Sequence, residues 1–294
     1  MKISILGGSG FIGSCFVRSL LKSDSDINYS FLKNDPTYKN GFQLDITNKK
    51  NVKEFFQKNN SDVVIFSSAL TNVDLCETKP ELAQTINVEG TENILNECKL
   101  YNSKLIYIST SAVFDGTKSE FSETDNPSPT SVYGITKLKG EKIIRKSGIP
   151  FLILRTDQPY GWPEKWQHTN SVYRVISSLE KNVKFNEVID WFNTPTYVPE
   201  FVHATNLLIE KEMEGIFHIV GSEYINRYEW ALKIADTFGL KKELIHKISS
   251  LDLDLHVKRN NVKLSNKKLK DKIGFEMSDI KKGLEKMLND QINF

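Results

Sequence analysis

The chain has 294 residues, 39% of them hydrophobic, and its 39 Lys and Arg nearly balance its 37 Asp and Glu, for a formal net charge of +2. This length suffices for one large hydrophobic core or two smaller ones, and so small a net charge gives no reason to expect nucleic acid or a membrane as partner. No apolar stretch approaches the ~20 residues that cross a bilayer, and no signal peptide precedes the first predicted strand, so we expect a cytoplasmic protein.

The first predicted unit is a strand, a glycine-rich turn and a helix. Residues 2–6 form a short apolar run typical of a buried strand, and residues 11–21 have helical apolar spacing. The turn between them reads Gly7-Gly8-Ser9-Gly10-Phe11-Ile12-Gly13. In this context the first glycine permits a tight turn, the second lets the backbone approach a pyrophosphate, and the third lets the helix pack on the strand. The unit therefore predicts a dinucleotide site.

Strand and helix patterns alternate through the rest of the first half. The predicted strands are 27–32, 62–66, 104–108 and 151–155, and the predicted helices are 48–59, 80–100 and 131–146. Regular alternation favours a parallel sheet with helices on both faces, which is the Rossmann-type doubly wound α/β fold.

The pattern changes from residue 159. Residues 162–168 are loop-like, strand character returns at 183–192 and 215–220, and the chain from Tyr224 is mainly helical. Asn226 and Glu229 fit the N-cap and N3 positions of one of these helices.

We predict two domains from this change. A dinucleotide-binding domain covers residues 1–158, with 193–221 returning to it, and a smaller substrate-binding lobe covers 159–192 and 222–294. The lobe is expected to lie over the carboxyl ends of the sheet and to leave a substrate cleft.

Tyr133 and Lys137 are the candidate acid–base pair. Four residues apart on a predicted helix, they share one face. A phenol with an ordinary pKa near 10 exchanges protons poorly at neutral pH, and a neighbouring ammonium group is expected to lower that pKa. A hydroxyl must still orient the reacting oxygen, and Ser109-Thr110-Ser111 at the end of the preceding strand offers one.

Lys33 bears on the choice of cofactor. It lies about twenty residues beyond Gly13, where an NAD-selective fold presents an acid to the ribose. A lysine there can meet a 2′-phosphate, so we predict that NADPH is accepted at least as well as NADH. Asp35 is the residue that could take the NAD role instead.

Several segments resemble the extended short-chain dehydrogenase/reductase family and, within it, the dTDP-4-dehydrorhamnose reductase-like branch. They are Gly7 to Gly13, 44–47, 69–74, 86–91, Thr110-Ser111-Ala112-Val113-Phe114-Asp115-Gly116-Thr117, Tyr133 to Lys137, and 154–156. The resemblance implies that Thr110, Tyr133 and Lys137 are catalytic.

It also implies the binding residues. The cofactor set is Gly7, Ser9, Gly10, Phe11, Ile12, Gly13, Lys33, Asp45, Ile46, Ser68, Ala69, Leu70, Tyr133 and Lys137, and the substrate set is Thr71, Val73, Thr110, Ser111 and Gln158. From the sequence pattern alone, Asp45 is equally well an ordinary acid at a helix N-terminus.

The chain departs from the branch at two positions that face the sugar. The reductases usually carry Asp where Ser111 stands, and a Trp where Gln158 stands. Sugar-nucleotide 4,6-dehydratases carry an Asp-Glu pair after the Thr, and the Ser111-Ala112 of this chain argues against dehydration. The identity of the sugar is therefore open.

The expected function is NAD(P)H-dependent reduction of a nucleotide-diphosphate-linked 4-keto-6-deoxy sugar. The alternatives are a nucleotide-sugar epimerase and a non-catalytic NADP-binding regulatory subunit like the β-subunit of methionine adenosyltransferase. The basic residues expected to frame the cleft are Lys165, Arg174, Arg227, Lys258 and Arg259. The five histidines show no metal-ligand spacing, so no metal site is predicted, and a homodimer is the assembly considered.

Overall fold

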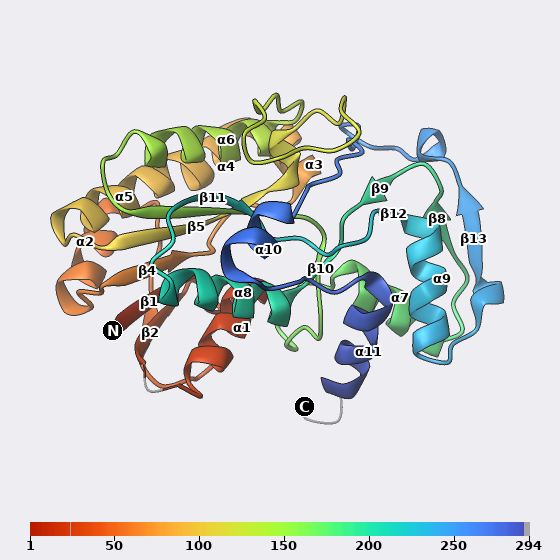
Figure 1. The fold of residues 1–294 in the computed structure, drawn as a ribbon, viewed down its shortest axis with the longest axis horizontal. Helices are drawn as coiled ribbons and strands as arrows, with labels where there is room; N and C mark the ends of the chain where they lie inside the picture. Colours follow the sequence, from red (N-terminus) through yellow and green to blue (C-terminus); the bar gives the residue numbers. More distant parts are fainter. Residues whose placement is uncertain (24, 291–294) are drawn as a thin grey trace.

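A seven-stranded parallel sheet forms the centre of the protein (Figure 1). The computed structural model describes residues 1–23 and 25–290. The strand order is β11-β6-β5-β4-β1-β2-β3, and every neighbouring pair is parallel. The strands are β1 (Lys2–Leu6), β2 (Asp26–Phe31), β3 (Gly41–Gln43), β4 (Val63–Phe66), β5 (Lys104–Thr110), β6 (Phe151–Thr156) and β11 (Gly215–His218). The predicted Rossmann-type fold is confirmed.

Helices cover both faces of this sheet (Figure 1). The helices α1 (Phe11–Leu20) and α8 (Val198–Glu210) pack together on one face, where the Phe16 and Phe201 rings meet edge to face with centroids 6.2 Å apart. On the other face lie α2 (Lys49–Lys58), α5 (Gly90–Leu100) and α6 (Val132–Arg145). Burial on both faces explains why the central strands read as continuous apolar runs.

The predicted helix over 80–100 contains a π-helical turn. The short α3 (Val73–Thr78) comes first, then α4 (Pro80–Gln84), the π turn over Thr85–Glu89, and α5. The turn buries Asn87, whose side chain bonds both the backbone of Leu70 and the hydroxyl of Thr136. Asn87 thereby fixes the loop after β4 against α6.

A second, smaller body packs beside the sheet (Figure 1). Its helices α7 (Ser171–Glu180), α9 (Arg227–Thr237) and α11 (Ile280–Asp290) enclose a separate core around the buried Trp230. Its strand pairs are β8 (Phe185–Val188) with β13 (Ile245–Ile248), β9 (Phe192–Asn193) with β12 (Ile225–Asn226), and β7 (Pro159–Tyr160) with β10 (Thr196–Tyr197). As predicted, the Asn226 side chain caps α9 by accepting the Glu229 amide at 2.8 Å.

The strand character predicted over 183–192 belongs to two short strands in the structure, not to one. It divides into β8 and β9, which pair with different partners. Between them Asp190 accepts hydrogen bonds from the backbone amide of Ser250 and the hydroxyls of Ser249 and Ser250. This connection redirects the chain between the two strands.

Two elements from late in the chain return to the sheet. The strand β11 forms its edge, and α10 (Lys267–Ile273) packs on β11 and contributes Leu269 and Ile273 to the core that contains α1 and α8. The domain boundaries given above stay a prediction. None of the helices within residues 1–23 and 25–290 is long and apolar enough to cross a membrane.

Candidate active site

A cleft of about 890 Å³ runs along the carboxyl ends of the central strands. It lies beside the point where the strand order reverses between β1 and β4, the usual ligand position in open α/β sheets. All five predicted substrate residues line it: Thr71, Val73, Thr110, Ser111 and Gln158. So do nine of the predicted cofactor residues: Ser9, Gly10, Phe11, Ile12, Gly13, Lys33, Ala69, Tyr133 and Lys137.

The glycine-rich turn forms one end of the cleft. Gly7 has a φ of +85°, a conformation that side chains disfavour, and a Cβ on Gly13 would overlap the carbonyl oxygen of Gly7. Gly10 is the N-cap of α1 and has no side chain to accept the amides of the first helical turn. Those amides and the positive end of the helix suit an anionic ligand, so the turn fits the pyrophosphate of a dinucleotide.

Tyr133 lies beside Thr110 because α6 begins close against the end of β5. The Ser131 hydroxyl caps α6 by accepting the Gly134 amide at 3.1 Å. A side chain at Gly134 would overlap the carbonyl oxygen of Ala112. The glycine after Tyr133 thus allows the helix to start in contact with the segment that follows Thr110.

Burial sets the direction of the pKa shifts of Tyr133 and Lys137. It raises the pKa of Tyr133 to about 12, and a hydrogen bond with the Thr110 side chain acts in the opposite direction. Burial lowers the pKa of Lys137 to about 7, and its Nζ lies 3.9 Å from the centroid of the Tyr107 ring. The expected lowering of the phenol pKa is therefore wrong for the free protein, because the desolvation of Tyr133 outweighs its neighbours.

Five predicted cofactor residues do not line the cleft: Gly7, Asp45, Ile46, Ser68 and Leu70. The Asp45 carboxylate accepts from the amide and the hydroxyl of Thr47, at 2.9 and 2.7 Å. Ile46 is buried in the sheet core. Their contacts with a cofactor stay predictions.

The second body borders the cleft on the side opposite the sheet. The Trp166 indole and the Gln167 amide both donate to the carbonyl oxygen of Ser9 at 3.0 Å, so the 162–168 loop holds the glycine-rich turn. This loop narrows the cleft but does not fill it.

The predicted basic residues divide into two groups. Lys258 and Arg259 line the cleft, and Arg259 pairs with Asp74 at 2.5 Å. Arg227, which is half-buried, donates to Gln158 at 2.9 Å, while Arg174 pairs with Glu187. Among the described residues that line the cleft, Arg174, Arg227 and Lys165 do not appear.

The residues of this cleft that sequence reasoning missed include a buried carboxylate and a buried amide. Asp157 at the end of β6 and Asn193 of β9 both line the cleft and are both buried. Asp157 stands between the 154–156 segment and Gln158 but was not itself singled out, and Asn193 stands in a segment without a recognisable motif. Their position next to Ser111 follows from contacts between distant segments.

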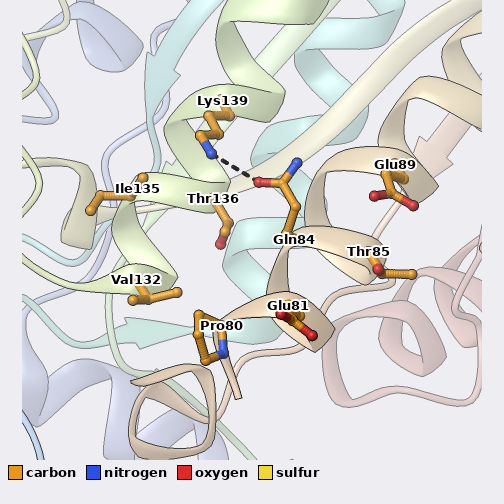
Figure 2. A pocket seen from close by; sticks show the side chains of 9 residues that line it. All are labelled: Pro80, Glu81, Gln84, Thr85, Glu89, Val132, Ile135, Thr136 and Lys139. Carbon is orange, nitrogen blue, oxygen red and sulfur yellow. Dashed lines mark hydrogen bonds between the residues drawn. The ribbon is translucent and has the colours of Figure 1, made fainter. Parts of the chain in front are cut away.

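A second hollow, of about 460 Å³, lies between α6 and the segment formed by α4 and the π turn (Figure 2). Its residues come from α4, the π turn and α6, and Lys139 Nζ donates to Gln84 Oε1 across it at 2.8 Å. None of the predicted site residues lines it.

Fold and cleft together define a nucleotide-binding protein of the Rossmann type. The chain belongs to the family described as RmlD substrate binding domain, which it matches over residues 1–293, within the extended short-chain dehydrogenases/reductases.

Named relatives have more than one function. The chain is 28% identical to a dTDP-4-dehydrorhamnose reductase of Aggregatibacter actinomycetemcomitans, with 97% of each chain covered. It is also 28% identical to methionine adenosyltransferase 2 subunit beta of Mus musculus, over 84% of this chain and 75% of that protein. The crystal structure of dTDP-4-dehydrorhamnose reductase from Bacillus anthracis in complex with NADP superposes with a TM-score of 0.89 at 26% identity, covering 98% of this chain and 99% of that one.

Proposed function

We propose that this protein is an NADPH-dependent reductase of a nucleotide-diphosphate-linked 4-keto-6-deoxy sugar. The observation that carries the proposal is the single cleft that joins the glycine-rich turn to Thr110, Tyr133 and Lys137 in a chain of this family. Similarity to reductases of dTDP-4-dehydrorhamnose, one of them in complex with NADP, supports both the reaction and the cofactor.

In the proposed reaction the glycine-rich turn and Lys137 would hold the dinucleotide, which would supply the hydride for the C4 carbonyl carbon. The Tyr133 hydroxyl donates a proton to the carbonyl oxygen, which becomes an alcohol. The Thr110 hydroxyl orients that oxygen by hydrogen bonding. The ammonium group of Lys137, four residues along the same helix face, stabilises the phenolate that proton donation leaves and holds a ribose hydroxyl.

The surroundings of Lys33 support NADPH as the preferred cofactor. Lys33 lines the cleft beyond the end of β2 and its side chain is exposed. The alternative acid, Asp35, already accepts a hydrogen bond from the Tyr29 hydroxyl at 2.8 Å, and also one from the Thr37 amide. Asp35 is thus held within its own loop, which leaves the cation as the group available to a 2′-phosphate.

The direct test is turnover of NADPH with a panel of nucleotide-linked 4-keto sugars, including dTDP-4-dehydrorhamnose. Stoichiometric oxidation of NADPH with formation of the 4-hydroxy sugar supports the reductase. An epimerase would interconvert sugars without net consumption of NADPH. No turnover on any member of the panel, with NADPH still bound, would contradict an enzyme of this class.

The second candidate is a non-catalytic, NADP-binding regulatory subunit. The specific observation in its favour is the similarity to methionine adenosyltransferase 2 subunit beta over 84% of the chain. Binding of a methionine adenosyltransferase catalytic subunit with no loss in a Tyr133→Phe variant would favour this candidate over the reductase.

We also propose a homodimer as the assembly. Leu82 of α4 and Ile135 of α6 are exposed by 39% and 40%, on the two helices that flank the hollow in Figure 2. Light scattering should give twice the chain mass, and Ile135→Glu should shift it toward the monomer. A monomeric wild-type protein would contradict the proposal.

A further inference from the structure

Asp157 places a buried carboxylate in the cleft, outside the catalytic set of Thr110, Tyr133 and Lys137. Its Oδ1 accepts a hydrogen bond from the Ser111 hydroxyl at 2.9 Å, and its Oδ2 accepts the Thr194 amide at 2.8 Å. The Asn193 side-chain amide approaches Oδ2 at 3.5 Å. Asp157 and Asn193 are 7% and 5% exposed, and both line the cleft. Any further hydrogen bond to their side chains therefore comes from a ligand in the cleft or from the protein interior.

Two oxygen atoms beside this carboxylate have no partner. Within residues 1–23 and 25–290, Asn193 Oδ1 and Thr194 Oγ1 are buried side-chain atoms that lack a hydrogen bond. Leaving such an atom unpaired costs about 1–3 kcal/mol, and native proteins seldom accept that cost without reason. An amide oxygen can only accept hydrogen bonds, so the missing partner of Asn193 is a donor.

The location of the cluster restricts which part of a ligand it can meet. Ser111 directly follows Thr110, and the charge of Asp157 contributes to raising the pKa of Tyr133, so the carboxylate is near the reacting end of the cleft. A carboxylate repels a diphosphate, which excludes the phosphate portion of a nucleotide sugar as its neighbour. The uncharged, hydroxyl-rich hexose is the remaining portion.

The side-chain oxygen of Gln158, by contrast, already accepts hydrogen bonds from the protein. Its Oε1 accepts from Arg227 at 2.9 Å and from the Ser171 hydroxyl at 3.2 Å. Its backbone has a φ of +38°, an unusual value for a residue other than glycine. Its side chain is bound to Arg227 and Ser171 and is therefore not available to a ligand through Oε1.

We propose that Asp157, Asn193 and Ser111 form a sugar-hydroxyl subsite, in which the carboxylate and the amide oxygen accept hydrogen bonds from the ring hydroxyls next to the C4 that is reduced. The inference rests on the proposed function and adds to it the residues that recognise the hexose. The sequence predicts that Ser111 and Gln158 both face the sugar; the proposal keeps Ser111 and replaces Gln158 with Asp157 and Asn193.

The test compares a nucleotide with its sugar derivative on protein saturated with NADP⁺. Calorimetric titrations use dTDP and dTDP-rhamnose, the latter being the alcohol that reduction of dTDP-4-dehydrorhamnose yields. Wild-type protein should bind dTDP-rhamnose about 10–100-fold more tightly than dTDP, as expected for hydrogen bonds to a charged acceptor. Asp157→Asn and Asn193→Ala should each remove most of this difference and leave the affinities for dTDP and NADP⁺ unchanged.

Asp190→Asn is the matched control. Asp190 is also a carboxylate held by serine hydroxyls and a backbone amide, but it does not line the cleft. This variant should retain the wild-type preference for dTDP-rhamnose. Thermal melts confirm folding, and Asn193→Ala, which leaves the Asp157 bonds to Ser111 and Thr194 intact, provides the test if Asp157→Asn does not fold.

Three results would overturn the subsite. The first is that Asp157→Asn and Asn193→Ala both still bind dTDP-rhamnose more tightly than dTDP by the wild-type factor. The second is wild-type protein that binds dTDP and dTDP-rhamnose equally, which leaves the reductase proposal in place if a 4-keto sugar is turned over. The third is wild-type protein that binds NADP⁺ but neither dTDP compound and reduces no nucleotide sugar, which removes the proposed function and the subsite together.

Discussion

Nη2 of Arg155 lies 2.6 Å from Oε2 of Glu141, and both side chains are only 1% exposed. The same carboxylate accepts the Ser109 hydroxyl at 2.6 Å, so one buried ion pair connects β5, β6 and α6 at the residue before Thr110. His218 of β11 lies 3.4 Å from Arg155, and burial together with the Arg155 charge lowers the His218 pKa to about 3, which keeps the imidazole neutral.

Glu141→Ala should destabilise the protein by about 3–5 kcal/mol, because it leaves the Arg155 charge buried without its partner. Urea denaturation measures the change. Glu54→Ala provides the control, since the Lys50–Glu54 pair is largely exposed and spans 3.9 Å, and its loss should cost at most about 0.5 kcal/mol. Equal effects of the two substitutions would contradict this account of the buried pair.

Tyr133→Phe should lower turnover by about 10²–10⁴-fold and leave NADPH binding intact, because only the proton donor is removed. Steady-state kinetics on a substrate identified from the keto-sugar panel and a fluorescence titration with NADPH measure the two effects. Tyr101→Phe, at the end of α5 away from the cleft, should behave as wild type. Undiminished turnover in Tyr133→Phe would exclude the phenol as the proton donor.

Lys33→Ala should weaken NADPH binding by about tenfold or more and leave NADH binding unchanged, because only NADPH carries the 2′-phosphate. Lys39→Ala is the control, since Lys39 is an exposed lysine of the same loop that does not line the cleft. A clear preference of the wild-type protein for NADH, insensitive to Lys33→Ala, would show that another group selects the cofactor.

Lys137→Met should change how stability depends on pH. The folded protein holds Lys137 with a pKa of about 7, below the ordinary 10.5, so between these values the unfolded chain binds more protons than the folded one. The contribution of Lys137 to the free energy of unfolding therefore rises with pH between about pH 7 and pH 10.5. From pH 7 to 9 the free energy of unfolding of wild type should gain on the order of 2–3 kcal/mol over Lys137→Met, measured by urea titrations. Parallel pH profiles would mean that Lys137 is not desolvated in the folded state.

The features predicted correctly from the sequence are those that neighbouring residues decide. The apolar runs of β1, β4, β5 and β6 and the glycines around Gly10 depend on chemistry within about ten residues of chain, and all appear where expected. The shared face of Tyr133 and Lys137 follows from helical periodicity alone. The strand character over 183–192 was also visible in the sequence, but its division into β8 and β9 was not. The two strands pair with segments more than thirty residues away, and local composition does not encode such a partner.

The sequence by itself determined the fold, the dinucleotide turn and the candidate acid–base pair. Only the tertiary structure brought Asp157 to Ser111, 46 residues earlier in the chain, and placed Asn193 beside them. It also reversed the direction expected for the Tyr133 pKa. The physical reason is the same in both cases: desolvation and hydrogen bonding at a buried atom depend on every segment packed around it, and most of those segments are distant in sequence.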